Sequence, residues 1–411
     1  MIYLDHAAAT PVCKKALKAM EPYFEAEFFN PSAAYLPAKK VAADYEAAKG
    51  VIGHCIGAKG TDIIITAGAT EANNLAFTAI QTEFIFRSGS RPAGPSPQAA
   101  GANSRAAALR NPPSQNINSV LYLEIEHDSV REIARQRGGV PIQVLPSGII
   151  DLQDLRSKIT DETELISVAL VNNELGTIQP LAEVAEIIRE VKLDRMRRGV
   201  TRQLLLHSDA SQAMNLLDIN VARLGVDLLT LNAAKVYGPK GVGALYVSHD
   251  ARLRPLVAGG GQERGLRSGT ENVPGAIGFA AALSEAKNHI KSNRAKYREL
   301  KQILLTELQG YELVNKKHTL DNFIVLCYNG LDAERLVFLL EEWGVYVATG
   351  AACAASKGVR SHVLSAIGLS EAEIAGSLRL SLGELNDADQ MHEAARIINK
   401  VVDGERKRVG S

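Results

Sequence analysis

Cysteine is scarce in this chain of 411 residues, and its four cysteines, Cys13, Cys55, Cys327 and Cys353, are far apart in the sequence. No two of them stand at the Cys-x-x-Cys spacing of a zinc site. The sequence therefore favours free thiols in a reducing compartment over disulfides, and we expect no metal site.

Long apolar runs and an excess of charge are also missing. No stretch stays apolar over the roughly 20 residues that a bilayer-spanning helix needs. The first residues, 1–6, lack the basic and apolar regions of a secretory signal. Lysine plus arginine and aspartate plus glutamate both number 46, so no basic excess is available to bind nucleic acid. We expect a cytoplasmic protein whose partners include neither membrane nor nucleic acid.

The first two thirds of the chain alternate between strand-like and helix-like stretches. This βαβ rhythm predicts an α/β fold with a mainly parallel sheet and helices on both faces. With 46% hydrophobic residues, the chain is long enough for two domains and a large core. The strand-like runs are 62–66, 120–126, 164–171, 203–208, 226–231 and 242–248, and a helix is expected at 181–196.

The last third predicts a smaller α+β domain. We expect a large domain over residues 16–257 and a small domain made of residues 1–15 and 258–411. The small domain's expected elements are a helix at 277–310, a strand at 322–328 and helices near 333–343 and 386–403.

Residues 88–118 fit neither domain. The segment is rich in Pro, Gly, Ser, Ala and Asn, and the chain from Glu83 to Glu124 contains several arginines but no acidic residue between them. This composition predicts a flexible insertion. It is either a solvated spacer or a docking segment for an acidic partner.

Lys235 stands at the end of an apolar strand-like run and is followed by the turn Gly238-Pro239. A lysine held between small residues and a rigid turn is a candidate for a Schiff base with an aldehyde cofactor. The alternative is an ordinary lysine at the end of a strand.

Asp209 and Gln212 follow another apolar run, Leu204-Leu-Leu-His-Ser-Asp209. Strand ends are where α/β proteins place their sites. A carboxylate there suits pyridoxal phosphate (PLP), because it stabilises the protonated ring nitrogen that makes this cofactor an electron sink. Gln212 could donate to the ring's phenolate oxygen. Alternatively, both residues cap a following helix.

Two further strand ends carry candidate binding groups. A β-branched run ends at Gly68, and Ala69 and Thr70 open a helix-like stretch whose free N–H groups and dipole suit a phosphate. His127 follows the run 120–126 and could stack on a planar cofactor, although a structural histidine is the alternative.

Together these segments resemble the cysteine desulfurases of the NifS/IscS type, which are class V aminotransferase-like PLP enzymes of fold type I. The resemblance covers nearly the whole chain to about residue 400. It rests on residues 3–11, Asn30-Pro-Ser32, Thr66–Glu71, Glu126-His127, Val171–Gly176, His207–Gln212, Lys235–Gly241, Gly259–Asn272 and Ser377–Gly383.

The resemblance implies a role for each candidate residue. Lys235 would carry the PLP aldimine, His127 would stack on the ring, Asp209 would pair with the ring nitrogen and Gln212 would contact the phenolate oxygen. The phosphate would be held by Ala69, Thr70 and, across a homodimer interface, Thr270. Asn173 and Arg379 match the positions that hold the substrate carboxylate, and the planar fork of arginine pairs well with a carboxylate.

A thiol would separate a desulfurase from an aminotransferase, and Cys353 provides one. It lies in Val345-Tyr-Val-Ala-Thr-Gly-Ala-Ala-Cys353, between small residues on both sides. Such a stretch has little to pack and could bring a thiolate nucleophile to the substrate. A cysteine buried in a small-residue turn is the alternative. The family has its persulfide cysteine at this spacing before the substrate arginine.

Two positions depart from the family, which usually has Ser and His where this chain has Asn232 and Ala234. Both family residues contact the phosphate. Asn232 can still donate through its amide, whereas Ala234 has no donor. A lost hydrogen bond to a charged group costs roughly 1.5–3 kcal/mol, so PLP is expected to bind ~10-fold or more weakly than usual.

The sequence thus predicts a PLP-dependent cysteine desulfurase that converts L-cysteine to L-alanine and carries the sulfur on Cys353 as a persulfide. The expected acceptor is a protein such as an iron–sulfur scaffold. Selenocysteine lyase or cysteine sulfinate desulfinase chemistry is the alternative within the fold. A non-catalytic sulfur-relay scaffold is suggested by Ala234, and a Rossmann oxidoreductase lacks its Gly-x-Gly-x-x-Gly motif.

Overall fold

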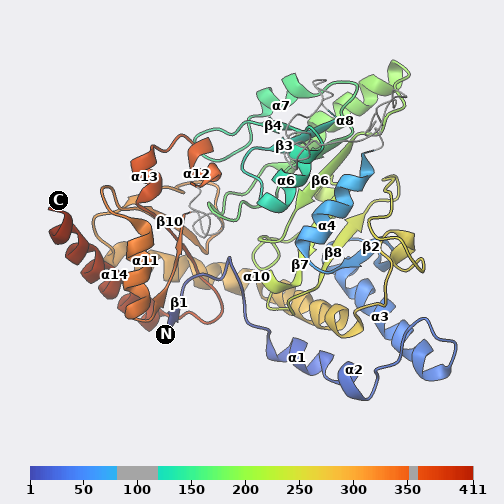
Figure 1. The fold of residues 1–411 in the computed structure, drawn as a ribbon, viewed down its shortest axis with the longest axis horizontal. Coiled ribbons are helices and arrows are strands. Elements are labelled where there is room, and N and C mark those ends of the chain that lie inside the picture. The colour runs from blue at the N-terminus through green and yellow to red at the C-terminus, as the bar shows by residue number, and fades with distance from the viewer. Residues whose placement is uncertain (81–118, 351–359, 411) are drawn as a thin grey trace, which may run out of the picture.

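The computed structural model describes residues 1–80, 119–350 and 360–410, and Figure 1 shows its strands gathered into two groups. The predicted insertion 88–118 and Cys353 lie outside the described residues. Among the helices that are described, none combines the length and the hydropathy needed to cross a bilayer.

The larger sheet is buried on both faces. Alternate side chains of its strands enter two apolar clusters, so that Leu205 lies in one and Leu206 in the other. Continuous apolar runs, rather than alternating polar and apolar residues, are typical of such a sheet. Its seven strands have the order β2 (Ile63–Thr66), β8 (Gly243–Val247), β7 (Leu228–Asn232), β6 (Leu205–Asp209), β5 (Leu165–Ser167), β3 (Val120–Leu123) and β4 (Val140–Ile142).

Strand direction in this sheet is mainly parallel. The neighbours β7, β6, β5, β3 and β4 pair in parallel, and β8 is antiparallel to both β2 and β7. The predicted fold class is confirmed. The helices of this part are α3 (Leu36–Cys55), α4 (Ala69–Ala76), α6 (Asp128–Gln136), α7 (Leu152–Lys158), α8 (Leu181–Arg197) and α9 (Val221–Leu224), with η1 (Gly60–Asp62), η2 (Phe77–Ala79), η3 (Ala233–Lys235) and η4 (Glu263–Gly265).

Two expected strands are shorter in the structure. The run 120–126 forms a strand only to Leu123, and the N–H of Glu126 donates to the Leu123 carbonyl in a turn at 3.0 Å. The run 164–171 forms a strand only over Leu165–Ser167. In both cases the chain leaves the sheet and its next residues line a cavity.

A second, antiparallel sheet has the order β12 (Ala348–Thr349), β13 (Ser377–Ser381), β10 (Phe323–Cys327) and β9 (Glu312–Leu313), and β1 (Ile2–Tyr3) pairs in parallel with β11 (Val345–Tyr346). The N–H of Ser381 donates to the Leu4 carbonyl at 2.7 Å, so the N-terminal strip lies beside β13. The remaining helices are α1 (Lys14–Met20), α2 (Pro22–Glu25), α10 (Val273–Glu307), α11 (Ala333–Glu342), α12 (His362–Ala366), α13 (Glu371–Ala375) and α14 (Ala388–Val409).

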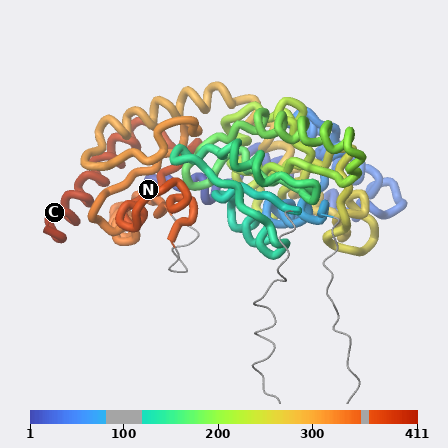
Figure 2. Tube along the Cα trace, turned by 90° about the horizontal axis from the view of Figure 1, so that it is seen from above, coloured from blue at the N-terminus to red at the C-terminus, as the bar shows by residue number. Residues whose placement is uncertain are grey.

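Helix α10 packs against helices near the larger sheet and also against a helix near the smaller sheet. It packs against α1 and α3 and also against α14, and Figure 2 shows it running along the upper side of the molecule. The boundaries 16–257 and 1–15 with 258–411 stay a prediction, and α10 begins shortly after the predicted change of domain.

The loop that carries Thr270 is fixed to the larger sheet by Glu263. This side chain is buried, and its two oxygens accept hydrogen bonds from the Tyr45 hydroxyl at 2.7 Å and the Ile65 N–H at 2.7 Å. Lys49 Nζ lies 3.4 Å away. Glu263 and Arg264 both have positive φ angles, 48° and 59°. The carboxylate therefore holds a strained turn in place.

We expect Glu263→Ala to lower the free energy of unfolding by about 3 kcal/mol, because it removes the buried partner of Lys49 and leaves the buried N–H of Ile65 without its acceptor. Glu46→Ala is the matched control. Glu46 also faces Lys49, but it is exposed, so its loss should cost about 0.5 kcal/mol or less. Denaturant unfolding of both variants measures the difference. Equal destabilisation would contradict the anchoring role of Glu263.

Candidate active site

A cavity of about 350 Å³ lies at the carboxyl ends of the parallel strands. Ligand sites in open α/β sheets occupy this edge. The cavity is lined by most of the predicted site residues, namely Ala69, Thr70, His127, Asn173, Asp209, Gln212, Asn232, Lys235 and Arg379, together with others such as Asp5, Ala7 and Glu126.

Lys235 ends the short 3-10 helix η3 that directly follows β7. Its half-buried amine donates to the carbonyls of Ala7 at 2.6 Å and Ala8 at 2.5 Å. The N-terminal strip thus holds the amine at the cavity. Gln212 donates to the same Ala7 carbonyl at 3.0 Å. The sequence predicted both residues but gave no role to the carbonyls that orient them.

Asp209, at the end of β6, is buried and oriented by two donors. Its Oδ1 accepts from the N–H of Ser211 at 2.9 Å, and its Oδ2 accepts from the Asn73 amide at 2.9 Å. Asn73 lies on α4 and donates also to the Ser129 hydroxyl at 2.8 Å. The carboxylate is therefore held in one orientation at the cavity. It caps no helix, because a turn follows β6.

His127 is the N-cap of α6. Its Nδ1 accepts from the Ser129 N–H at 3.1 Å, and the Ser129 hydroxyl lies 2.9 Å from the same nitrogen. Accepting through Nδ1 places the proton of the neutral ring on Nε2. A chain of contacts from His127 through Ser129 and Asn73 to Asp209 thus fixes the ring and the carboxylate together. The sequence reasoning missed Ser129 and Asn73.

The predicted phosphate cradle is the start of α4. The helix begins at Ala69, and its N-cap Gly68 has φ 146°, which disfavours any residue with a side chain. A Cβ built at Gly68 would meet nothing within 4 Å, so space is open in front of the first turn. The unpaired N–H groups and dipole of a helix start suit a phosphate.

Asn232 also faces the cavity, and its Oδ1 accepts from the N–H of Ala234 at 3.2 Å. That bond leaves the amide nitrogen of Asn232 as the donor end of the side chain. Ala234 is half-buried and offers no side-chain donor. The expected weakening of a phosphate site stays a prediction.

Arg379 lies on β13 and brings the smaller sheet into the site. The side chain is buried and donates to Asp5 Oδ1 at 2.6 Å and to the Asn173 carbonyl at 3.0 Å. Its Nε is buried without a partner among the described residues. Asp5, for which the sequence reasoning gave no role, therefore holds the guanidinium predicted to bind a carboxylate.

Two predicted residues remain, Thr270 and Cys353. Thr270 is exposed and does not line the cavity of its own chain. Cys353 lies outside the described residues, and the structure describes only the chain on either side of it. Ala348, on one side, is the strand partner of Arg379. Ser361, on the other side, donates to Glu174 at 2.5 Å.

The residues present fit PLP. A lysine amine, a fixed carboxylate, a histidine ring and a helix start surround one cavity, whose volume falls in the usual range for ligand sites, roughly 300–1,000 Å³. Within the described parts of the chain, no group of three His, Cys, Asp or Glu side chains could hold a metal ion.

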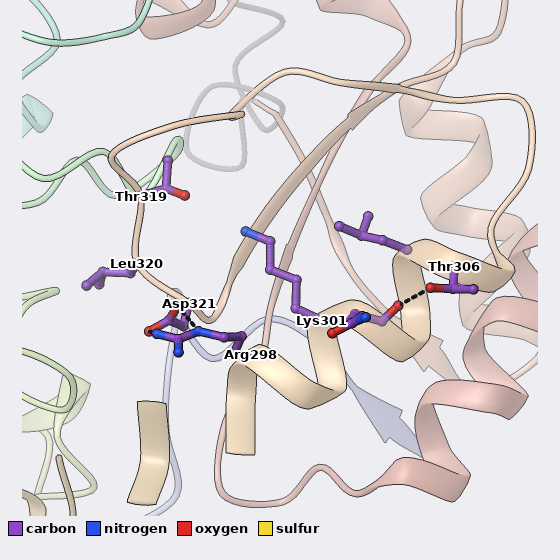
Figure 3. Close-up of a pocket in the computed structure, with 8 residues that line it drawn as sticks. Arg298, Lys301, Thr306, Thr319, Leu320 and Asp321 are labelled. Atoms are coloured by element: carbon purple, nitrogen blue, oxygen red, sulfur yellow. Dashed lines mark hydrogen bonds and ion pairs between the residues drawn. The ribbon is translucent and has the colours of Figure 1, made fainter. Parts of the chain in front are cut away.

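A second cavity, of about 390 Å³, lies between α10 and the chain before β10. Figure 3 shows Arg298 facing Asp321 there, and the pair is hydrogen-bonded at 3.3 Å. Lys301 donates to the Phe323 carbonyl at 2.7 Å. Although this cavity is slightly larger, its charged side chains bind other groups of the fold, and we do not assign the chemistry to it.

The sheet order and the lysine-bearing cavity define an α/β protein of the aminotransferase type. The family model for aminotransferase class-V matches residues 2–90 and 99–393. The chain belongs to this family.

Several similar proteins carry the name cysteine desulfurase. Cysteine desulfurase IscS 1 of Archaeoglobus fulgidus is 32% identical, over 98% of this chain and 97% of that protein. Cysteine desulfurase IscS of Methanosarcina thermophila is 33% identical, over 98% and 92%. The resemblance predicted from the motifs is confirmed.

Solved structures agree. A NifS-like protein has a TM-score of 0.81 and 26% identity, covering 98% of this chain and 99% of its own. The protein SspA, solved in complex with cysteine, has a TM-score of 0.73 and 32% identity, covering 93% of this chain and 99% of its own.

We expect Ala234→His to slow the loss of PLP during dialysis by about tenfold, because it adds a donor to the phosphate. Ala234→Leu adds volume without a donor and is the control. If wild type and Ala234→His lose PLP at the same rate, other groups already satisfy the phosphate and the expected weakness does not exist.

Proposed function

We propose that this protein is a PLP-dependent cysteine desulfurase that converts L-cysteine to L-alanine and transfers the sulfur to Cys353. The observation that carries the proposal is the Lys235 amine at the end of β7, in one cavity with Asp209 and Arg379. The relatives named cysteine desulfurase and the cysteine complex of SspA support the substrate.

Lys235, Asp209, His127, Gln212 and the start of α4 would hold the cofactor, with Asn232 as a further donor. PLP, when bound, supplies an electron sink for the substrate's α-carbon. Asp209 suits the ring nitrogen, because a carboxylate fixed by Asn73 and Ser211 favours a neighbouring cation.

Arg379 and Asn173 would hold the substrate carboxylate, and Lys235 would carry the α-proton. The Cys353 thiolate would attack the substrate sulfur, forming an S–S bond as the Cβ–S bond breaks. The electron pair of the Cβ–S bond passes to the substrate, which takes up one proton at Cβ and regains the α-proton from Lys235 to give alanine. The substrate's thiol proton stays on the outer sulfur of the persulfide, and the proton that Cys353 loses on ionisation balances the one taken up at Cβ.

The chain on both sides of Cys353 supports its role. β12 pairs with β13 at the cavity, since Ala348 is the strand partner of Arg379, which lines it. Ser361 is bound to Glu174, the residue after Asn173. Selenocysteine lyase or sulfinate desulfinase chemistry would depend less on the Cys353 thiol. A sulfur-relay scaffold would not turn over L-cysteine.

The protein is proposed to act as a homodimer in the cytoplasm and to pass sulfur to an acceptor such as an iron–sulfur scaffold protein. Thr270 is exposed and outside its own cavity, as expected of a residue that serves the partner subunit. Large apolar side chains from Leu17 to Leu36 are also exposed, including Phe24 and Phe28 at 65% and 68%. Such a cluster is typical of a surface that another chain covers.

The direct test is turnover of L-cysteine by the PLP-loaded protein, measured as L-alanine. Lys235→Ala should abolish it, because the cofactor's attachment and the proton carrier are both lost. Lys240→Ala, an exposed lysine in the following turn, is the control and should retain turnover. A wild-type protein that cannot be loaded with PLP would favour the scaffold alternative.

Cys353→Ser should stop sulfide release in the presence of a thiol reductant while L-cysteine still changes the cofactor's absorbance, because substrate binding does not need the thiol. Cys13→Ser, at a half-buried free cysteine, should behave as wild type. Wild-type sulfide release by Cys353→Ser would favour the lyase chemistry.

Light scattering should give about twice the 44.1 kDa chain mass. Thr270→Ala should raise the dissociation constant for PLP by about tenfold, as expected for one charge-assisted hydrogen bond, without lowering the unfolding temperature. The exposed Thr201 provides the control variant, Thr201→Ala. A monomer with full activity would contradict the shared site.

A further inference from the structure

The turn that carries Asn173 is held at three points. The first is Asn172, whose Oδ1 accepts hydrogen bonds from the N–H groups of Glu174 at 2.9 Å and Leu175 at 2.8 Å. The Asn172 amide also donates to the Ile125 carbonyl at 2.8 Å, in the segment that follows β3. This point ties the turn to the larger sheet.

The other two points come from the part of the chain around the smaller sheet. Arg379 donates to the Asn173 carbonyl at 3.0 Å. The Ser361 hydroxyl donates to Glu174 Oε2 at 2.5 Å. Ser361 and Glu174 are both buried, with 1% and 8% of their surfaces exposed. Because water is excluded from it, a hydrogen bond from a hydroxyl to a carboxyl oxygen is strong here.

Ser361 is the N-cap of α12, and this determines the direction of its proton. Its Oγ accepts from the Leu364 N–H at 3.0 Å, which is the capping bond. The O–H is left for Glu174. One side chain therefore joins the start of α12 to the turn that carries Asn173.

A second contact places the same helix against the neighbouring segment. His362 is the first residue of α12, and its Nε2 lies 3.0 Å from the Glu126 carbonyl. A carbonyl only accepts, so Nε2 is the donor. Figure 1 shows α12 on the side of the smaller sheet that faces the larger sheet. The start of α12 thus contacts both segments of the cavity wall, the one after β3 and the one after β5.

We propose that Ser361 is a positioning residue, which through its hydrogen bond to Glu174 holds the turn that presents Asn173 to the substrate carboxylate. This role rests on the proposed function, which assigns the carboxylate to Asn173 and Arg379. Ser361 does not line the cavity, so it acts through Glu174 and does not touch the ligand. Without its hydroxyl the turn is held at two points instead of three, and carboxylate binding weakens.

L-alanine and ethylamine differ only in the carboxylate, so this pair of ligands isolates the group that Asn173 would hold. Binding of each to the PLP-loaded protein is measured by the change in the cofactor's absorbance. Ser361→Ala should raise the dissociation constant for L-alanine about tenfold, and that for ethylamine by less than about twofold. An equal rise for both ligands, or no rise for L-alanine, would overturn the proposal.

Ser370→Ala is the matched control for the lost helix cap. Ser370 is the N-cap of α13, and its hydroxyl accepts from the Glu373 N–H as that of Ser361 does from Leu364. Ser370 is exposed and does not line the cavity. The control should keep both dissociation constants within about twofold of wild type. A rise for L-alanine equal to that of Ser361→Ala would show that any weakened cap has this effect, and the proposal would fail.

The partner of Ser361 is tested by a double-mutant cycle. Glu174→Gln keeps an oxygen that accepts from Ser361, so L-alanine should bind within about threefold of wild type. Glu174→Met has no such acceptor and should weaken L-alanine binding about tenfold. The double variant with Ser361→Ala should be no weaker than either single variant, because both remove the same bond. Additive losses, about a hundredfold together, would contradict the proposal.

Hydrogen exchange of the cofactor-free protein tests the turn itself. In Ser361→Ala the amides of residues 174–176 should exchange at least about tenfold faster than in wild type, whereas Ser370→Ala should leave them unchanged. Unchanged exchange in Ser361→Ala would overturn the proposal.

These measurements also separate the role of Ser361 from the proposed function. If wild type binds no PLP, the proposed function fails and the carboxylate's binding site with it, whereas the exchange still reports whether Ser361 holds the turn. If wild type binds PLP and turns over L-cysteine but Ser361→Ala binds L-alanine normally, only the role of Ser361 fails.

Discussion

The common direction of β2, β3, β5, β6 and β7 brings the carboxyl ends of five strands to one edge of the larger sheet. Side chains separated by more than a hundred residues in the sequence therefore surround one cavity. Lys235 follows β7 and Asp209 ends β6. The smaller sheet adds Arg379 from β13, and the N-terminal strip adds the carbonyls that hold Lys235. No single segment of the chain contains all of these groups, so the cavity depends on the edge that the strands share.

The hydrogen-bond and ion-pair partners of each buried group in the cavity determine whether that group can carry a charge. Asp209 has two donors and Arg379 has a carboxylate partner, so both can carry charge where they are buried. Glu126 has no cationic partner among the residues that the structure describes, and burial raises its pKa to about 8. The two buried carboxyl groups thus have different partners, and burial shifts the pKa of Glu126 upward.

The sequence predicted Lys235, Asp209 and His127 because a polar residue after an apolar strand is a local pattern. It predicted the parallel sheet from the alternation of strand-like and helix-like stretches, which is also a local pattern. Asn73 and Ser129 could not be found in this way, since their roles depend on two helices, α4 and α6, meeting across the sheet's edge. The role of the Ala7 carbonyl depends on a contact across 228 residues. The proposed role of Thr270 needs a second chain, which one sequence does not place.

The proposed chemistry requires that the cofactor attach to Lys235. Reduction of the PLP-loaded protein with borohydride, followed by mass spectrometry of its peptides, tests this claim most directly. We predict a pyridoxyl phosphate label on the peptide that contains Lys235 and loss of that label when L-cysteine is added before reduction. A label on another lysine, or no label on a protein that binds PLP, would contradict the account.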